Sequence, residues 1–413
     1  MAQVNITLNE EEVLQVITGD RNEALKFLLE KILNEIMKAE SEDQLGASRH
    51  ERSADRTDYR NGTRERELTT RIGTITLQVP RHRNEPFHTM VFDNYSRSEA
   101  SLIATMIQMV IAGVSTRKVS KVVETLCGKS YSKSMVSELC KKLDEDIRRF
   151  RQQSLDWLDA PFLMVDATYF KVREDHRIVS KAFMVALAIK SDGHREVVSF
   201  NVYDTENDYC WKQFLADLRN RGLRSIDLII SDAHRSIRKA IAEVYPDTAW
   251  QRCQVHFLRN ILGETPPRYK EGLKMELREM FDVGDVRAVR KKRDEIIADY
   301  EPVAEKAMRL LDEGFEDSMT VMTLPKHTRI ILRSTNILER LNRELKRRSD
   351  VIQIFPNTAS VLRLMGAVTL EHSERQSTVQ RIFSEQKFAE IRHRMVEELR
   401  QIAARQVALL KAA

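Results

Sequence analysis

The chain has 413 residues, which is long for one domain, and its hydrophobic content of 42% suffices for buried cores. The net charge of +5 is modest, but basic residues gather in five runs, at 81–83, 141–142, 148–151, 290–293 and 346–348. The four cysteines form no CxxC pair, which argues against a disulfide framework or a zinc ribbon, and the absence of a signal peptide or long apolar run predicts a soluble cytoplasmic protein with no membrane partner.

Residues 1–97 are predicted to form a helical region followed by a small β-hairpin. Apolar residues recur at helical spacing over 9–40. Residues 41–64 are polar and charged, and we interpret them as a flexible or DNA-contacting link. Apolar residues then alternate over 68–79, with Gly73 as the expected turn, which is typical of a hairpin.

Residues 98–152 are predicted to be helices with two breaks, at 112–116 and 128–132. Ser132 is expected to cap a short basic helix. Two short helices joined by a tight turn, the second one basic, resemble a DNA-binding helix-turn-helix. A helical hairpin used only for packing explains the pattern about as well, so both interpretations stay open. The candidate DNA contacts on this helix are Lys133, Lys141 and Lys142.

Residues 153–258 change character, because short apolar runs with a preference for β-structure replace the helical pattern. The predicted order is strand, strand, strand, helix, strand, helix, strand, which is that of the ribonuclease H fold. The first and fourth strands are neighbours in that arrangement. Asp166 and Asp232 stand where the apolar runs of those two strands end, so we expect them to face each other across a gap that suits a metal ion.

Residues 259–330 are predicted to form an all-helical insertion, because the separation between Asp232 and the next candidate acid is longer than a simple ribonuclease H core needs. A helix within 331–350, with Ser334 or Thr335 as its cap, returns to the core, and residues 351–413 add a C-terminal helical region. The polar face of the returning helix carries Glu339, Asn342, Arg343 and Lys346 at helical spacing.

Three acids placed in this way suit two divalent metal ions, and two metals suit phosphodiester chemistry. Carboxylate oxygens prefer hard cations, so we expect Mg²⁺, with Mn²⁺ able to substitute. Together with the basic runs, the acids indicate an enzyme that cuts or joins nucleic acid. Taken alone, Asp166 and Asp232 are explained equally well as strand-end caps without a catalytic role, and by residue type alone Glu344 and Glu374 rival Glu339.

Three longer segments carry a resemblance to a known family. They are Val165–Arg173, Trp250–Asn260, and Ser334–Asn336 leading to Glu339–Asn342. In these segments the chain resembles bacterial insertion-sequence transposases related to plant Mutator elements, and the resemblance extends over roughly residues 55 to 370. Ala233 and Ser236 depart from the glycines that relatives usually carry around the second acid, but the acid itself is in place.

The resemblance implies a DDE transposase of the α/β class. Its ribonuclease H-like core is interrupted by the helical insertion and flanked by a helical N-terminal DNA-binding region and the C-terminal helices. Asp166, Asp232 and Glu339 would be the catalytic triad and the metal ligands, with Asp166 bridging two ions. The resemblance also implies a Cys-x-x-His element at Cys253 and His256. Two ligands do not make a zinc site, so we expect this element to hold the loop after the last strand or to contact DNA.

The implied activity is to bind the terminal inverted repeats of an insertion sequence, cleave a strand and transfer the 3′-hydroxyl, by copying out through a circular intermediate and pasting in. The implied partners are double-stranded DNA of the repeats and the target, and a second copy of the chain, at the bacterial nucleoid and without a small-molecule cofactor. The rivals are a ribonuclease H-like nuclease or resolvase without strand transfer, and a non-catalytic DNA-binding regulator. Backbone contacts near the cut are expected from Arg340, Arg343, Lys346, Arg347 and Arg348.

Overall fold

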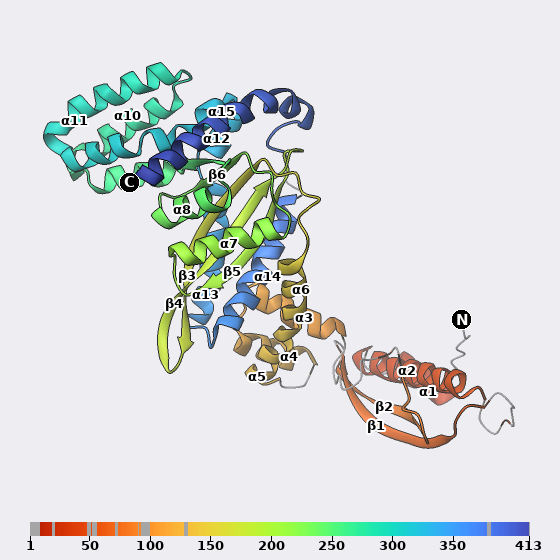
Figure 1. Cartoon of the computed structure of the whole chain (residues 1–413). Helices are drawn as coiled ribbons and strands as arrows, with labels where there is room; N and C mark the ends of the chain where they lie inside the picture. The colour runs from red at the N-terminus through yellow and green to blue at the C-terminus, as the bar shows by residue number, and fades with distance from the viewer. Residues whose placement is uncertain are drawn as a thin grey trace. The chain divides into compact units, whose positions relative to one another are not determined.

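The computed structural model describes residues 9–18, 21–47, 51, 56–70, 73–89, 91, 100–127, 131–377 and 381–412 (Figure 1). The chain forms two compact units, Met1–Lys142 and Leu143–Ala413. Among the described residues, no helix combines the length and the apolar character needed to cross a membrane.

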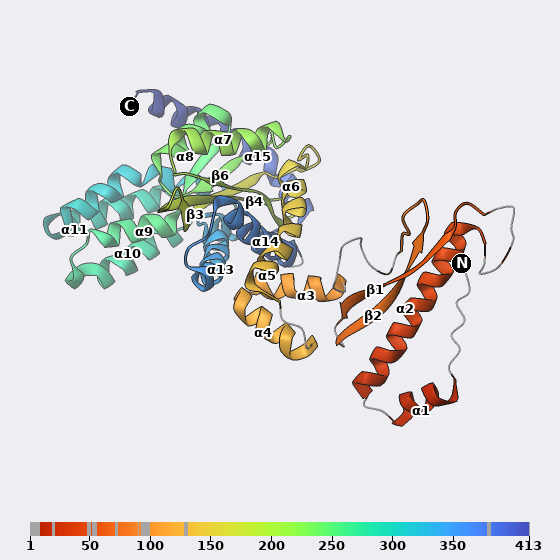
Figure 2. The same ribbon diagram turned by 90° about the horizontal axis from the view of Figure 1, so that it is seen from below.

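The first unit begins with a hairpin packed on a long helix (Figure 2). Its elements are α1 (Glu10–Thr18), α2 (Arg21–Leu45), β1 (Arg60–Thr70) and β2 (Gly73–His82). The strands pair antiparallel, and Leu68, Ile75 and Leu77 pack with Met37 of α2. The predicted hairpin is confirmed. The predicted link over 41–64 is wrong at both ends, because α2 continues to Leu45 and residues 60–64 belong to β1.

The rest of the first unit is a small helical cluster of α3 (Ala100–Ile111), α4 (Thr116–Cys127), α5 (Lys133–Leu139) and the 3-10 turn η1 (Cys140–Lys142). Its core includes Met106, Val119 and Val136. Ser132 caps α5 as predicted, since its side chain accepts a hydrogen bond from the backbone N–H of Met135. The predicted tight turn lies largely at 128–130, outside the described residues, so the choice between a helix-turn-helix and a packing hairpin stays open.

The second unit is built on a five-stranded mixed sheet of order β5-β4-β3-β6-β7. The pairs β3–β4 and β4–β5 are antiparallel, whereas β3–β6 and β6–β7 are parallel. The predicted element order and the predicted adjacency of the first and fourth strands are both confirmed. The elements are β3 (Phe162–Glu174), β4 (Arg177–Ile189), β5 (Arg195–Tyr203), α7 (Asp208–Asn220), β6 (Leu228–Ser231), α8 (Arg235–Val244) and β7 (Ala249–Arg252).

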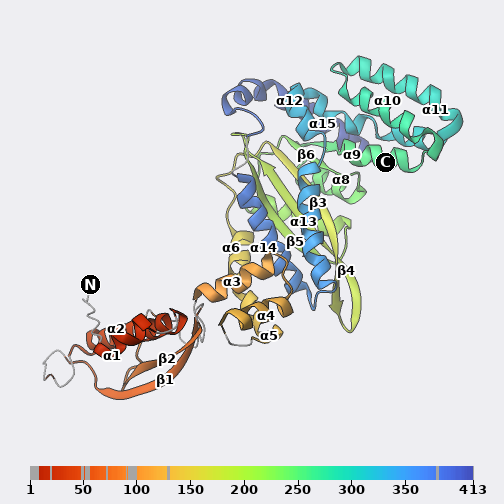
Figure 3. The ribbon, with the colours of Figure 1, turned by 180° about the vertical axis from the view of Figure 1, so that it is seen from behind.

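Helices cover both faces of this sheet (Figures 1 and 3). α7 and α8 lie on one face, where Trp211 and Phe214 pack with the apolar side chains of β3 and β4. α13 (Asn336–Ile352) and α14 (Thr358–Ser377) lie on the other face. The C-terminal helix α15 (Glu385–Ala412) runs beside β7, where the Gln406 side chain bonds both the N–H and the C=O of Trp250 at 2.9 Å. Helix α15 therefore covers β7, which is an edge strand of the sheet.

Helix α6 (Leu143–Gln152) belongs to the second unit, although the sequence placed it in a domain over 98–152. Phe150 stacks on Phe200 of β5 at 5.2 Å between ring centroids. Arg363 of α14 also donates two hydrogen bonds to the Asp144 carboxylate, at 2.7 and 2.6 Å. These tertiary contacts decide where α6 packs.

The stretch predicted as an insertion is helical, with its own apolar core that includes Leu273, Leu277, Ile296 and Leu311. Its elements are α9 (Gln254–Gly263), η2 (Pro267–Tyr269), α10 (Lys270–Asp282), α11 (Val286–Gly314), η3 (Glu316–Ser318), η4 (Thr320–Thr323) and α12 (Lys326–Leu332). The fully buried Gln251 of β7 ties these helices to the sheet. Its amide donates to the Ser318 carbonyl and accepts from the Val321 N–H, both at 2.8 Å.

Gly193 in the predicted turn between β4 and β5 is expected to be hard to replace. Its φ of +86° disfavours any side chain, and a Cβ would lie 2.3 Å from the Phe383 carbonyl oxygen. We expect Gly193→Ala to lower the free energy of unfolding by about 1–3 kcal/mol in urea titrations. Gly263→Ala is the matched control, because a Cβ there meets nothing within 4 Å. Equal, small effects of the two variants would contradict this expectation.

Candidate active site

Asp166 and Asp232 are brought together by the parallel pairing of β3 with β6. Met164 lies opposite Ile230, and continuing this register by two residues places Asp166 opposite Asp232, just beyond the end of β6. The apolar runs before each acid are buried, because helices cover both faces of the sheet there. The two carboxylates are therefore neighbours, as the sequence predicted, but Asp166 lies within β3 rather than at its end, because β3 continues to Glu174.

Glu339 stands one turn into α13, whose start is tied to the ends of β6 and β7 by Cys253. The Cys253 N–H donates to the Ser231 carbonyl at 2.7 Å, and its buried sulfur accepts from the N–H and the hydroxyl of Thr335, both at 3.4 Å. Thr335 therefore occupies the cap position without capping, since its hydroxyl bonds Cys253 instead of the helix. The Cys-x-x-His element thus fixes where the Glu-bearing helix begins.

The three acids line one open pocket of about 650 Å³ between the sheet, α9 and α13. Its acidic side is Asp166, Asp232 and Glu339, and its rim is largely basic. The lining residues are Asp166, Ala167, Thr168, Asp232, His256, Arg259, Glu339, Asn342, Arg343, Lys346, Arg347 and Asp350. Acids at the base and cations at the rim give the pocket the charge pattern expected for metal-assisted chemistry on a phosphate.

Burial and the charge of Asp232 raise the pKa of Asp166 from 3.8 to about 7. Its two oxygens accept hydrogen bonds from the Ala167 N–H and the Asn342 side-chain amide, each at 2.9 Å. Asp232 accepts from the His234 N–H at 3.2 Å. The two neighbouring carboxylates repel each other and are partly buried, so a bound cation would stabilise them.

Glu339 is engaged by two cationic side chains of α9. Arg259 donates to both of its oxygens, at 2.9 and 3.1 Å, and His256 Nε2 lies 3.3 Å from Oε1. The adjacent Cys253 side chain, then the charges of Asp166 and Glu339, raise the pKa of His256 from 6.5 to about 9. As they stand, no three His, Cys, Asp or Glu side chains in the described part of the chain converge closely enough to hold a metal ion.

The predicted DNA contacts on α13 fall into three groups. Arg343, Lys346 and Arg347 are exposed and line the pocket. Arg340 is exposed but lies outside the pocket. Arg348 is 7% exposed and forms an ion pair with Glu344 at 2.8 Å, so this side chain does not face the pocket. In the first unit, Lys133, Lys141 and Lys142 are exposed at the surface.

The sequence interpretation missed two charged residues of this region. Arg259 lies in the segment Trp250–Asn260, which carries the family resemblance, one helical turn after His256. That spacing could have indicated that the two side chains share a helix face. Glu206, before α7, had no such signal. Burial and the charge of Asp232 raise the Glu206 pKa, and its backbone N–H donates to the Tyr169 hydroxyl at 3.3 Å. Asn342 was placed on the correct helix face, but its bond to Asp166 was not foreseen.

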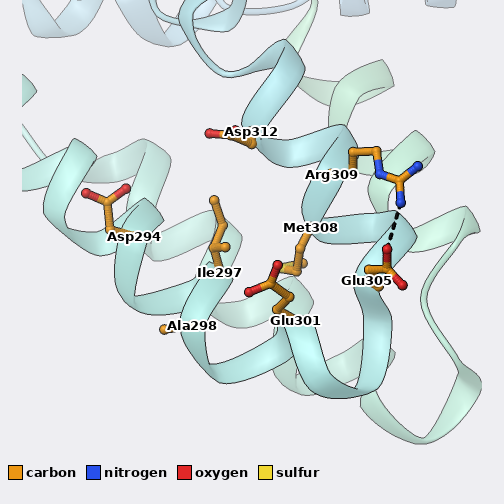
Figure 4. A pocket seen from close by; sticks show the side chains of 8 residues that line it. All are labelled: Asp294, Ile297, Ala298, Glu301, Glu305, Met308, Arg309 and Asp312. Atoms are coloured by element: carbon orange, nitrogen blue, oxygen red, sulfur yellow. Dashed lines mark hydrogen bonds and ion pairs between the residues drawn. The ribbon is translucent and has the colours of Figure 1, made fainter.

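A second pocket lies in the helical stretch after β7, between the two arms of α11 at its kink near Ala304 (Figure 4). Four of its lining residues are acidic and one is basic, and Arg309 is paired with Glu305 at 2.7 Å. Phosphate groups would be repelled there, so the pocket between the sheet and α13 is the better candidate for a nucleic-acid site. The lining residues are Asp294, Ile297, Ala298, Glu301, Glu305, Met308, Arg309 and Asp312.

Comparison with known proteins identifies the class of protein. The family model described as "Transposase, Mutator family" matches residues 1–378. The chain belongs to the Mutator family of transposases.

Its relatives include named transposases of individual insertion sequences. The transposase for insertion sequence element IS256 in transposon Tn4001 of Staphylococcus aureus is 40% identical over 378 residues, which cover 91% of this chain and 97% of that protein. The transposase for ISRM5 of Rhizobium meliloti is 39% identical over 85% of this chain and 88% of its own length. That for IS1081 of Mycobacterium tuberculosis is 35% identical over 85% of each.

Among solved structures, a Mos1 transposase paired-end complex with left transposon end matches 40% of this chain and 61% of that chain. Its sequence identity is 11% and its TM-score is 0.15, a value too low to indicate a shared fold.

Proposed function

We propose that this transposase has a ribonuclease H-like core and uses Asp166, Asp232 and Glu339 as a DDE triad to cut and join DNA strands. The observation that carries the proposal is that three acids, more than 170 positions apart at the extremes, line one pocket with a basic rim. Membership of the transposase family supplies the substrate class. A helical stretch between the second and third acids fits the proposed insertion in the core.

The donor set fits divalent cations. Its ligands would be carboxylate oxygens, which suit Mg²⁺ or Mn²⁺, and a positive charge would offset the burial and the repulsion by Asp232 that raise the pKa of Asp166. Asp166, Asp232 and Glu339 would hold two ions, with Asp166 shared. Bound there, the ions would supply an activated nucleophile and a stabilised leaving oxygen for an in-line displacement.

The side chains of the chain itself would orient the acids and the DNA. The Asn342 amide donates to one oxygen of Asp166 and would hold the orientation of that carboxylate. Arg343, Lys346 and Arg347 at the rim would bind the phosphate backbone, so affinity should fall as salt rises. Lys346 already lies close over β3, since it donates to the Tyr169 carbonyl.

The relatives are named as transposases for insertion sequence elements, so the proposed substrates are the terminal inverted repeats of such an element and a target duplex. We propose that a homodimer joins the two ends at the nucleoid, by copy-out through a circular intermediate and paste-in. The helical cluster with Lys133, Lys141 and Lys142 is a candidate for recognising the repeats.

The test compares strand nicking and joining on DNA that carries the inverted repeats flanking this gene. Wild type and Glu339→Gln are each assayed with Mg²⁺ and with EDTA. We expect nicking followed by joining in wild type with Mg²⁺ only, and neither in the variant. Nicking without joining would favour a plain nuclease, and binding without any cutting would favour a regulator.

A further inference from the structure

Both carboxylate oxygens of Glu339 are hydrogen-bonded to Arg259 in this structure. The guanidinium donates one N–H to each carboxylate oxygen, at 2.9 and 3.1 Å, which is the planar two-bond geometry that makes arginine–carboxylate pairs specific. His256 Nε2 adds a third contact, 3.3 Å from Oε1 of Glu339. Both oxygens that a cation would need are therefore already bonded.

The two partners differ in exposure. The Arg259 side chain is 59% exposed, whereas that of Glu339 is 22% exposed. Arg259 thus stands on the solvent side of the pair, in the pocket where DNA is proposed to enter. The two non-bridging oxygens of a DNA phosphate can accept two parallel N–H bonds from one guanidinium, as the two oxygens of a carboxylate do. A DNA phosphate at the rim could replace Glu339 as the partner of Arg259 without leaving the guanidinium unpaired.

Arg259 is expected to contribute little to the stability of the fold. α9 is anchored by the buried Phe257 and Ile261, and its start is tied to α13 through Cys253 and Thr335. An ion pair with one largely exposed partner contributes only about 0–1 kcal/mol to stability. The geometry of the pair therefore bears on the state of Glu339 more than on folding.

We propose that Arg259 is an exchangeable counter-ion of Glu339: it holds the third acid while no DNA is bound, and passes to a DNA phosphate in the pocket, which frees Glu339 to complete the cation site. This inference rests on the proposed function. Such an exchange couples the two binding events. Bound DNA raises the affinity for the cation, and a bound cation raises the affinity for DNA. Arg259 is a positioning residue in this account, since it acts through Glu339.

The test measures Mn²⁺ affinity, from the paramagnetic resonance of free Mn²⁺, on the full-length chain with and without DNA. The DNA is a repeat-end duplex with phosphorothioate linkages and a dideoxy 3′ end, so that binding is measured without turnover. In wild type, we expect DNA to tighten Mn²⁺ binding about tenfold or more. In Arg259→Ala, we expect binding without DNA to be about as tight as in wild type with DNA, and the further effect of DNA to fall below about twofold.

Arg290→Ala is the matched control. Arg290 forms a similar two-bond pair with Glu316 in the insertion, at 3.1 and 3.0 Å, and its side chain is 51% exposed. This variant should behave as wild type. Arg259→Gln, which keeps hydrogen-bonding capacity without the charge, should follow Arg259→Ala and provides a second variant if Arg259→Ala does not fold.

The proposal is overturned if DNA tightens Mn²⁺ binding in both Arg259 variants as much as it does in wild type. It is also overturned if the Mn²⁺ affinity of these variants without DNA is equal to or weaker than that of wild type. Asp166→Asn separates this failure from that of the proposed function. If Asp166→Asn binds Mn²⁺ as tightly as wild type, the cation site itself is misplaced. If Asp166→Asn loses Mn²⁺ binding while the Arg259 variants behave as wild type, only the exchange is wrong.

Discussion

Asp166→Asn is expected to abolish strand cleavage and, at the same time, to make the cation-free protein more stable. The loss of cleavage follows because the variant removes the carboxylate that is proposed to serve both ions. Removing charge stabilisation worth several kcal/mol corresponds to a fall in rate of roughly a thousandfold or more. The measurement is the rate of nicking on the repeat duplex with Mg²⁺.

The gain in stability follows from the raised pKa of Asp166. A carboxyl whose pKa is about 7 in the folded chain and 3.8 otherwise contributes stability below pH 3.8 that is lost as the pH rises through 7. At about 1.4 kcal/mol per unit, the cost of the ionised form has an upper bound of about 4 kcal/mol. We expect Asn to recover about 1–2 kcal/mol at pH 8, because one of the two hydrogen bonds is lost with the second oxygen.

Urea unfolding in EDTA at pH 8 and pH 5 checks this, and the gain should be smaller at pH 5. Asp208→Asn is the control of opposite sign, because a hydrogen bond from Lys239, then one from Ser236, lowers the pKa of Asp208. That variant should lose stability at both pH values. A stability of Asp166→Asn equal to or below wild type at pH 8 would contradict the account of the two acids.

Gln251→Leu is expected to be among the most destabilising single changes in the second unit. Leucine has a similar volume, but it would leave the buried Val321 N–H without its acceptor and remove one donor from the Ser318 carbonyl. Leaving such groups unpaired in the interior costs about 2–4 kcal/mol in total. Helices α9–α12 should also be held less firmly to β7, so limited proteolysis within them should be faster.

Gln254→Leu is the comparison variant. Gln254 donates to the same Ser318 carbonyl at 2.8 Å, but Gln251 still satisfies that carbonyl when Gln254 is replaced. We expect a loss of no more than about 1 kcal/mol in urea unfolding. If the two variants lost equal stability, the attachment of α9–α12 to β7 would not depend on the hydrogen bonds of Gln251.

The sequence predicted what depends on local pattern. Apolar runs and turn residues gave the order of strands and helices in the second unit, and the adjacency of β3 and β6 then placed Asp166 beside Asp232. Helical spacing correctly put Asn342, Arg343 and Lys346 on the face of α13 that carries Glu339. Signals of this kind repeat every two or every three to four residues, so they can be read without knowing the fold.

Other features could not be predicted, because they depend on partners far away in the chain. Residues 60–64 of β1 are polar and exposed, so they lack the alternation of apolar and polar residues that predicts a strand. The burial of Arg348 and the attachment of α6 to α14 are set by packing rather than by local pattern. The pairing of Glu339 with Arg259 joins positions 80 residues apart, and only the folded chain brings them together.

The most direct test of the central claim is the position of bound Mn²⁺ in crystals of the protein with a repeat-end duplex, located by anomalous scattering. We expect two peaks in the pocket at Asp166, Asp232 and Glu339, with Arg259 bonded to a DNA phosphate. No peak at Asp166, or peaks only at other acids such as those of the pocket in α11, would contradict it.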